Sequence, residues 1–267
     1  MWTQSDFDRI LVRKAVIGMV HLRPLPGAPL FGGSMAAVID AAAADVEALR
    51  LGGADALLFE NFGDRPFRPG AVDAVTISTM TVVITALRSE LSVPFGVNVL
   101  RNDGQSALSI AVATGAAFIR VNVLIGAMVT DQGVIAGEAD RILRMRANLG
   151  ADVAIFADHM VKHAVPLAPV DPAQSARDLR QRGLADVLVA SGPRTGSPPE
   201  IEHLRALREL TEAPIVLGSG VNEANAASFA SSADGAIVGT SVKIGGIVDQ
   251  PVDSDRVRRV VDRFKSS

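Results

Sequence analysis

The chain lacks cysteine and tyrosine altogether and has a single tryptophan among its 267 residues. Without cysteine it has no disulfide framework, no zinc ribbon and no thiol catalysis, and we expect a reducing, cytoplasmic setting. Few aromatic rings are present on which nucleic-acid bases could stack. The net charge is −3 and the arginines are scattered along the chain. No basic stripe results, so we expect no nucleic-acid partner.

Long apolar runs are missing as well. No uncharged apolar segment reaches the length of about 18 residues that a membrane-spanning helix needs, so we expect no membrane span. The first residues, MWTQSDFDRILVRK, mix acidic and basic side chains and lack an apolar core, so we expect no signal peptide there. Lysine is scarce, which gives weight to any lysine near a candidate site. The four are Lys14, Lys162, Lys243 and Lys265.

Short apolar runs rich in β-branched residues recur eight times, and each is followed by a segment with helical patterning. Such runs are typical of parallel strands covered by helices. The runs are 15–21, 55–60, 94–100, 117–123, 152–158, 185–191, 214–219 and 235–240. Eight uninterrupted strand–helix units predict an α/β fold, a single (β/α)8 TIM barrel that forms one domain over residues 1–267, with residues 1–14 as a capping segment.

An open, doubly wound sheet would show the same local pattern, and the count of eight favours the closed barrel. Residues that cap helices precede four of the helical segments. They are Ser34 before 35–51, Asp171 before 172–182, Asn222 before 223–231 and Ser254 before 255–265. The segment 124–136 is longer than a simple connection, and we interpret it as a functional loop.

Polar side chains gather at the carboxyl ends of the predicted strands, where the active sites of TIM barrels lie. Seven are candidate catalytic residues: His21, Glu60, Asn98, Arg120, Asn122, Asp158 and Lys162. Arg120 and Asn122 are two residues apart and share one face of a strand. Glu60 and Arg120 stand on alternate strands, so we expect them in one inward layer. They could form a structural ion pair, or Arg120 could meet an anionic ligand while Glu60 orients it or moves a proton.

Glycine-rich turns follow the last two predicted strands. Glycine lets backbone N–H groups approach an anion, and Lys243 would add a positive charge. Phosphate sites after the seventh and eighth strands recur in TIM barrels, although tight turns alone also favour glycine. We predict a phosphate site made of Ser191, Gly192, Gly218, Ser219, Gly220, Gly239, Thr240 and Lys243.

The chemistry of the candidate catalytic residues stays open between several alternatives. Asp158 or Glu60 is the expected acid or base. Lys162 could be a Schiff-base nucleophile, a proton carrier, a charge partner for a ligand anion or a solvated surface lysine. Asp158, His159 and His163 with Glu60 could also hold a divalent metal. No tight spacing motif such as HExxH supports this, so we predict no cofactor and no metal site.

The motifs of the chain resemble those of the BtpA/SgcQ family over nearly the whole length. The segments that carry the resemblance are GMVHL at 18–22, PLPG at 24–27, ENFGD at 60–64, GVNVLRN at 96–102, FIRVN at 118–122, DQG at 131–133, KHA at 162–164 and GSG at 218–220. The resemblance implies a phosphate-binding barrel, and the family is named after a role in photosystem I biogenesis in cyanobacteria. Relatives are also labelled phosphoribosylanthranilate isomerase, which uses a cysteine as its base, and this chain has no cysteine.

Two functions are consistent with these observations. One is an enzyme that acts on a phosphorylated sugar or nucleotide-like small molecule by isomerisation, aldol chemistry or hydrolysis. The other is a non-catalytic assembly or biogenesis factor that keeps a phosphate site. Several titratable side chains at successive strand ends favour the enzyme, because a bare phosphate site would not need them. Homo-oligomer formation is left open.

Overall fold

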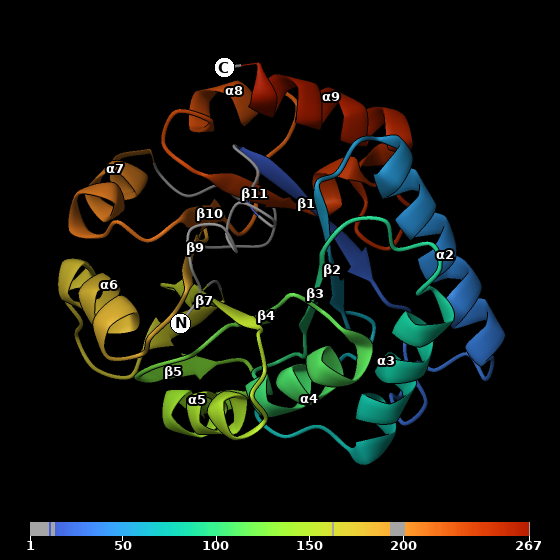
Figure 1. The fold of residues 1–267 in the computed structure, drawn as a ribbon, viewed down its shortest axis with the longest axis horizontal. Coiled ribbons are helices and arrows are strands. Elements are labelled where there is room, and N and C mark those ends of the chain that lie inside the picture. Colours follow the sequence, from blue (N-terminus) through green and yellow to red (C-terminus); the bar gives the residue numbers. More distant parts are fainter. Residues whose placement is uncertain (1–10, 12–13, 162, 193–200, 267) are drawn as a thin grey trace.

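Eight parallel strands close into a barrel in the computed structural model, which describes residues 11, 14–161, 163–192 and 201–266 (Figure 1). The barrel strands are β1 (Ala15–His21), β2 (Ala56–Glu60), β3 (Phe95–Asn98), β4 (Phe118–Val121), β7 (Ala154–His159), β9 (Val187–Ala190), β10 (Ile215–Leu217) and β11 (Gly235–Val238). They follow one another around the barrel in chain order, and β11 pairs with β1 to close it. All eight predicted strands and the closed barrel are confirmed, and the open-sheet alternative is wrong.

A ring of helices surrounds the barrel (Figure 1). The helices are α2 (Met35–Leu51), α3 (Ala74–Ala86), α4 (Gly104–Thr114), α5 (Ala139–Asn148), α6 (Pro172–Gln181), α7 (Ile201–Leu210), α8 (Ala226–Phe229) and α9 (Ser254–Lys265), with 3₁₀ turns η1 (Thr240–Val242) and η2 (Ile244–Gly246). Within the described part of the chain, no helix is both long and apolar enough to cross a membrane.

Two of the four predicted helix starts are confirmed by their caps. The side chain of Ser34 accepts a hydrogen bond from the backbone N–H of Ala37, and Asp171 accepts one from Ala173. The other two starts are shifted. Asn222 instead accepts from the N–H groups of Ala224 and Asn225, which makes a turn before α8. At α9 the cap is Asp253, one residue earlier than predicted.

Strand alternation divides the core into two layers, as the period of two along a strand requires. Ile17, Met19 and Leu58 point into the barrel, where Phe118 and Phe156 stack with their ring centroids 4.5 Å apart. Phe59, in the layer between strands and helices, points outward. The apolar interior fills the lower barrel, and the polar residues lie above it at the carboxyl ends of the strands.

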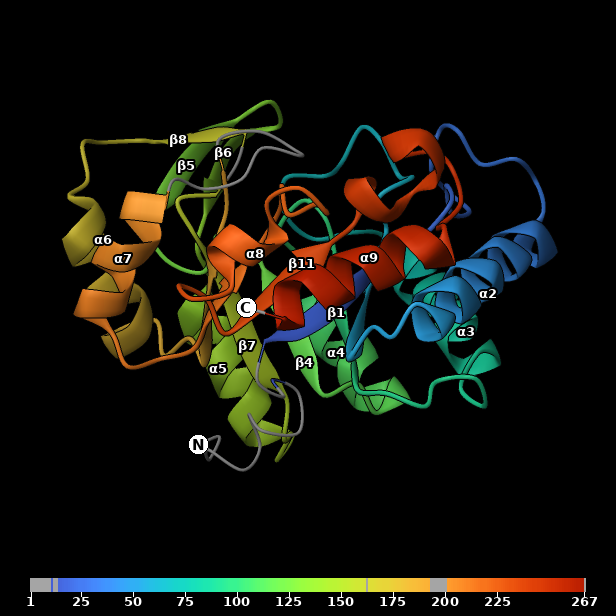
Figure 2. The ribbon, with the colours of Figure 1, turned by 90° about the horizontal axis from the view of Figure 1, so that it is seen from above.

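Residues 124–136 form more structure than the predicted loop. They contain β5 (Ala127–Thr130) and β6 (Gly133–Ala136), which pair antiparallel, and β8 (Ala164–Pro166) adds a third strand. Since β5 and β6 follow the carboxyl end of β4 and β8 follows that of β7, this small sheet lies at that end of the barrel, on the side of α6 and α7 (Figure 2). Its inner residue Ile135 packs on Val123 and Val161.

Of the predicted capping segment 1–14, only Leu11 and Lys14 belong to the described residues. Leu11 is buried in the apolar cluster of the barrel interior, together with Ala15 and Ile17. The remainder of the segment lies outside the described part of the chain.

Replacing Phe118 by alanine tests the interior layer. The ring is fully buried and stacked on Phe156, so Phe118→Ala removes its contacts and leaves a cavity. We expect the free energy of unfolding in urea to fall by about 3–5 kcal/mol. The exposed Val134 on the small sheet is the control, and Val134→Ala should change it by less than about 0.5 kcal/mol. A similar small effect for both variants would contradict the packing described here.

Candidate functional site

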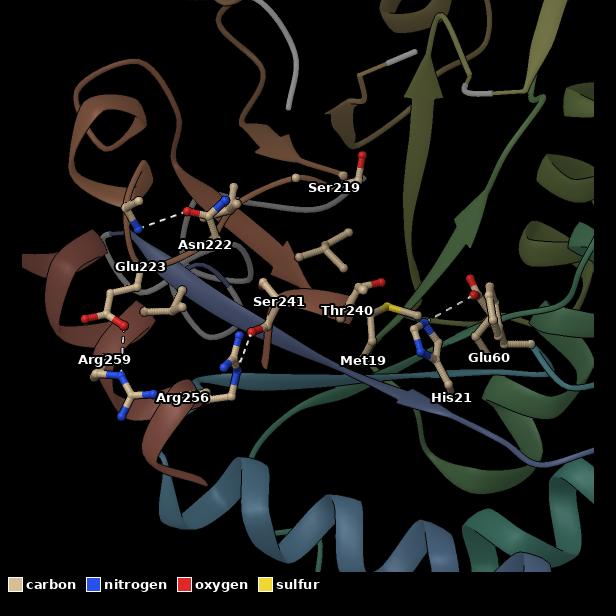
Figure 3. A pocket seen from close by; sticks show the side chains of 18 of the residues that line it. Met19, His21, Glu60, Ser219, Asn222, Glu223, Thr240, Ser241, Arg256 and Arg259 are labelled. Carbon is tan, nitrogen blue, oxygen red and sulfur yellow. Dashed lines mark hydrogen bonds and ion pairs between the residues drawn. The ribbon is translucent and has the colours of Figure 1, made fainter. Parts of the chain in front are cut away.

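A cavity of about 450 Å³ opens at the carboxyl ends of the barrel strands (Figure 3). Strand β1 contributes Met19 and His21, β2 contributes Glu60 and β4 contributes Arg120. The turns after β10 and β11 line the opposite side, together with two arginines of α9, Arg256 and Arg259. One cavity therefore joins candidate catalytic residues to the predicted phosphate turns.

His21 and Glu60 form a pair on the wall of this cavity. They are register partners on adjacent strands, and His21 Nε2 lies 3.7 Å from Glu60 Oε1 (Figure 3). The His21 ring stacks on Phe62 with the ring centroids 4.5 Å apart. A Cβ added at Gly239 would come within 3.0 Å of His21, so glycine there leaves room for the ring. An imidazole beside a carboxylate can move a proton to or from a ligand.

Arg120 pairs with Asp158 of the neighbouring strand β7. Its Nε donates to Asp158 Oδ1 at 2.8 Å and its Nη2 donates to Oδ2 at 2.9 Å, in a buried bidentate arrangement. Burial, the largest single effect, would lower the pKa of Arg120, but the charge and hydrogen bonds of Asp158, together with the charge of Glu60, raise it, so the guanidinium stays charged. Of the two alternatives for Arg120, the direct ion pair with Glu60 is not found among the described residues: Asp158 on β7 binds the guanidinium, while Glu60 lines the same cavity and acts on Arg120 through its charge.

Two asparagines extend the network around Asp158. Asn122 Nδ2 donates to Asp158 Oδ2 at 3.2 Å. Asn98 Nδ2 donates to Asn122 Oδ1 at 3.2 Å and to the Arg120 carbonyl at 3.0 Å. The Asp158 side chain is fully covered, and the cavity lining includes neither Asp158 nor the asparagines. Asp158 and the asparagines therefore contact Arg120 on the side away from the cavity. Because Glu60 lines the cavity and Asp158 does not, the geometry favours Glu60 as the acid or base.

Residues of the turns after β10 and β11 that line the cavity have backbone N–H groups without an acceptor among the described residues. Among the described residues, no hydrogen bond uses the backbone N–H groups of Gly220, Val221, Thr240 or Ser241. Gly220 has a φ of +79°, a conformation that favours glycine. Gly218, Ser219, Gly239 and Thr240 also line the cavity, as predicted for a phosphate site. Such a concentration of N–H groups suits an anion.

The positive charge at these turns comes from α9. Arg256 Nε donates to the Ser241 carbonyl at 2.9 Å, and Arg259 Nε donates to Glu223 Oε2 at 2.8 Å (Figure 3). Sequence reasoning missed both arginines. Their spacing of three residues puts them on one helix face, which is a signal, but nothing in the sequence shows that this face meets the last two turns.

Lys243, predicted to supply that charge, is placed elsewhere. Its ammonium donates to Asp45 Oδ2 on α2, both side chains are buried, and the cavity lining does not include Lys243. Asp45 Oδ1 also accepts from the N–H of Val252. The η1 turn directs this lysine toward α2, and its role is to anchor the turn.

Ser191 and Gly192, two other predicted site residues, are not part of the cavity lining. Ser191 is buried at the end of β9 and does not line the cavity, but a Cβ added at Gly218 would lie 2.3 Å from its Oγ. Gly192 follows it and is also outside the lining. Lys162 lies outside the described residues.

The histidines considered for metal binding are dispersed. His159 Nε2 contacts the Pro172 carbonyl at 3.1 Å, and the ring stacks on His203 of α7 at 5.3 Å. His159 does not line the cavity. Within the described part of the chain, no three His, Asp or Glu side chains are grouped in a way that could hold a metal ion, so Asp158, His159 and His163 with Glu60 do not assemble there.

Arg101, after β3, is a further residue that sequence reasoning missed. It is buried near Asp158, Asp131 and Glu60, and burial lowers the pKa of its guanidinium while these carboxylates act in the opposite direction. It lies in the GVNVLRN segment, but the residue type alone does not show that it turns inward.

The model of the BtpA family matches residues 12–266 of the chain. The chain belongs to the BtpA family. A relative described as an uncharacterized protein of Thermococcus kodakarensis is 46% identical over 97% of both chains. Photosystem I biogenesis protein BtpA of Synechocystis sp. is 44% identical over 96% of this chain and 90% of its own. The resemblance read from the motifs is confirmed.

Solved structures similar to this BtpA family member are TIM-barrel proteins. Tryptophan synthase of Mycobacterium tuberculosis has a TM-score of 0.61 at 16% identity, covering 98% of this chain and 96% of its own. N-(5′-phosphoribosyl)anthranilate isomerase of Pyrococcus furiosus has a TM-score of 0.55 at 14% identity, covering 95% of this chain and 100% of its own. At these identities the likeness shows the fold alone.

His159 makes the stability of the protein depend on pH. Burial and then the nearby His203 lower the pKa of His159 to about 4, from 6.5 in the unfolded chain. As the pH falls below 6.5, His159 becomes protonated in the unfolded chain but stays neutral in the folded protein. The free energy of unfolding therefore decreases until about pH 4, where the folded protein is protonated as well. We expect this residue to account for a loss of about 3 kcal/mol.

Urea unfolding of the wild type and of His159→Gln at pH 7 and pH 4.5 measures this contribution. Glutamine keeps a donor for the Pro172 carbonyl but does not titrate, so the variant should lose less stability on acidification. Equal losses for the two proteins would rule out His159 as the source.

Proposed function

We propose that this protein is an enzyme that binds a phosphorylated sugar or nucleotide-like small molecule and moves a proton at the end of the ligand opposite its phosphate. The observation that carries the proposal is that the His21–Glu60 pair and the donor-rich turns after β10 and β11 line the same cavity. A ligand held at one end by its phosphate would be presented to the proton-transfer pair at the other.

The phosphate end is supported by its donors and its charge. The N–H groups of Gly220, Val221, Thr240 and Ser241 can donate to the phosphate oxygens, and Arg256 adds a cation that its bond to the Ser241 carbonyl holds in place. Thiamine phosphate pyrophosphorylase and N-(5′-phosphoribosyl)anthranilate isomerase, both from Pyrococcus furiosus, are among the structural neighbours, and their names refer to phosphorylated compounds.

The reacting end favours isomerisation over the other reactions considered. Glu60 can take a proton from a carbon beside a carbonyl group, His21 can relay a proton, and the charged Arg120 can stabilise the oxygen on which negative charge develops. Asp158 and the asparagines behind it hold Arg120 in place for that task. The isomerase that relies on a cysteine base is not the model here, because this chain has no cysteine, and the proposal assigns the base to Glu60.

A second candidate is a non-catalytic role in the assembly of a protein complex. It is favoured by the relative named Photosystem I biogenesis protein BtpA, which is 44% identical to this chain. A relative from Caenorhabditis elegans is 31% identical to this chain, and its occurrence in an animal favours a general chemical role over one in photosystem assembly. The assembly role predicts phosphate binding without turnover.

Removing the Arg256 charge tests the phosphate end. We expect inorganic phosphate and sugar phosphates to raise the melting temperature of the wild type, and Arg256→Gln to weaken their binding by about tenfold or more, because a charge-assisted contact is lost. Arg258→Gln is the control, since Arg258 lies on the same helix but pairs with Asp255 away from the cavity. Equal binding by the two variants would remove the phosphate site from these turns.

Solvent exchange tests the proton transfer without knowledge of the product. In D2O, the wild type should exchange a carbon-bound hydrogen of its sugar phosphate for deuterium, which NMR detects. Glu60→Gln cannot accept the proton, so exchange should slow by at least about a hundredfold, while inorganic phosphate still binds. Binding without exchange in the wild type would favour the assembly role instead.

A further inference from the structure

The donor-rich turns after β10 and β11 lie between two parts of the cavity. One part is the reacting end, where β1, β2 and β4 contribute their side chains. A Cβ added at Gly239 would lie 3.0 Å from the His21 ring, and one added at Gly218 would lie 3.2 Å from Arg120 Nη2. Each turn therefore begins directly beside a residue of the reacting end.

On the other side of the turns, the cavity continues to α9. Figure 3 shows Glu223 and Arg259 at one end of the cavity and Glu60 at the other, with Thr240 and Ser241 between them. We call the part beyond the turns the outer subsite. It is lined by Val221, Asn222, Glu223, Ala224, Arg259 and Val260. A phosphate bound at the turns would thus have cavity on both of its sides.

The outer subsite offers groups that suit a planar ring with polar edges. Arg259 Nε donates to Glu223 Oε2 at 2.8 Å, and both side chains are about half exposed. A guanidinium stacks its flat face on an aromatic ring, and a carboxylate accepts hydrogen bonds from an amino group of such a ring. Ala224, which is exposed, and Val260 add apolar surface. This combination fits a nucleobase.

The arginines of α9 also fit a bridge of two phosphates. Arg256 is held at the turn after β11 by the Ser241 carbonyl, and Arg259 lies one helical turn farther along the same face. One phosphate can contact the turn and Arg256 while the next contacts Arg259. The cavity of about 450 Å³ lies in the range of about 300–1,000 Å³ that pockets for drug-sized ligands occupy. A sugar monophosphate anchored at the turns would occupy only one side of it.

We infer that the phosphate held at the turns is internal to the ligand, with the reacting sugar on one side and a nucleoside in the outer subsite on the other. The substrate class is then a sugar with a free carbonyl group that a diphosphate bridge joins to a nucleoside, rather than a sugar monophosphate. The inference rests on the proposed function, which supplies the anchor at the turns and the proton transfer at Glu60. It adds the group beyond the phosphate.

Ligands that share one sugar test the outer subsite. The diphosphoriboses of adenosine, cytidine, guanosine and uridine, here the nucleoside ligands, are compared by calorimetry with ribose 5-phosphate and ribose 5-diphosphate, which lack the nucleoside. We expect the best nucleoside ligand to bind at least about tenfold more tightly than either reference, because a stacked base adds affinity. If none of them binds more tightly than ribose 5-diphosphate, the inference is overturned.

The failure of this inference is distinguishable from that of the proposed function. If ribose 5-phosphate binds through Arg256 and exchanges its hydrogen, but no nucleoside ligand binds more tightly, the proposed function stands and only the outer subsite is wrong. If neither inorganic phosphate nor any of these ligands binds the wild type, the phosphate site is wrong and the inference falls with it.

An exposed alanine allows the outer subsite to be filled without removing a charge. Ala224→Phe adds a ring to its lining, so the best nucleoside ligand should bind about tenfold or more weakly, while ribose 5-phosphate binds as before. Ala227→Phe is the matched control, since Ala227 is also exposed but is not part of the lining. Any result other than a selective loss in Ala224→Phe contradicts the inference.

Arg259→Gln supplies a second test that does not depend on Ala224. An exposed ion pair contributes little to stability, so the variant should fold like the wild type. The affinity for the nucleoside ligand relative to ribose 5-diphosphate should fall several-fold, and a general loss of positive charge cancels in this ratio. Arg258→Gln, which changes an arginine paired with Asp255 outside the lining, should leave the ratio unchanged. An unchanged ratio in Arg259→Gln removes the nucleoside from the outer subsite.

Discussion

The candidate site depends on one buried ion pair, that between Arg120 and Asp158. Desolvation of two charges is costly, and such a pair often contributes little to the stability of a fold. What the pair does provide is a guanidinium that stays charged inside the barrel, with its orientation fixed by two parallel hydrogen bonds. Asn122 and Asn98 fix the carboxylate in turn. Under the proposed function, Arg120 is therefore oriented before a ligand binds, and its side chain would need no reorganisation as charge develops on the ligand.

The proposed phosphate end of the cavity is fixed by a different set of contacts. The turn after β11 is held from behind by Lys243, whose ammonium is buried against Asp45 of α2, and from the side by Arg256 of α9. Two helices from opposite ends of the chain thus position the same short turn. These contacts fix the backbone of the turn, which a glycine-rich turn alone would not ensure. Lys243 thus fixes the turn from the side of α2, which explains why this buried lysine does not line the cavity.

The sequence was informative where short-range rules decide. The eight apolar runs and the alternation within them predict the barrel and the inward direction of Glu60 and Arg120, because a strand has a fixed period. The sequence did not predict which of several possible partners a charged side chain binds. Arg120 had more than one carboxylate within reach, and only the three-dimensional structure shows that Asp158 on the adjacent strand accepts from its Nε and Nη2. The same reason explains why Lys243 was expected at the anion site and Arg256 was missed: Lys243 binds Asp45 of α2, and Arg256 reaches the turn from α9, and both helices are remote in sequence from the partner they contact. The small sheet formed by 127–136 and 164–166 likewise depends on a pairing between distant segments.

The arrangement of charges also bears on the choice between an enzyme and an assembly factor. A protein that needed the barrel only as a surface for other proteins would gain nothing from an ion pair buried below a cavity, since apolar residues of similar size would serve its core as well or better. Nor would it need an imidazole and a carboxylate held 3.7 Å apart on the cavity wall. Groups of this kind are costly to keep in an apolar surrounding and become useful when a ligand places a reacting atom between them. The free energy needed to bury these charged groups is thus best explained if the cavity is an active site. A family member can have a further role in the biogenesis of a larger complex.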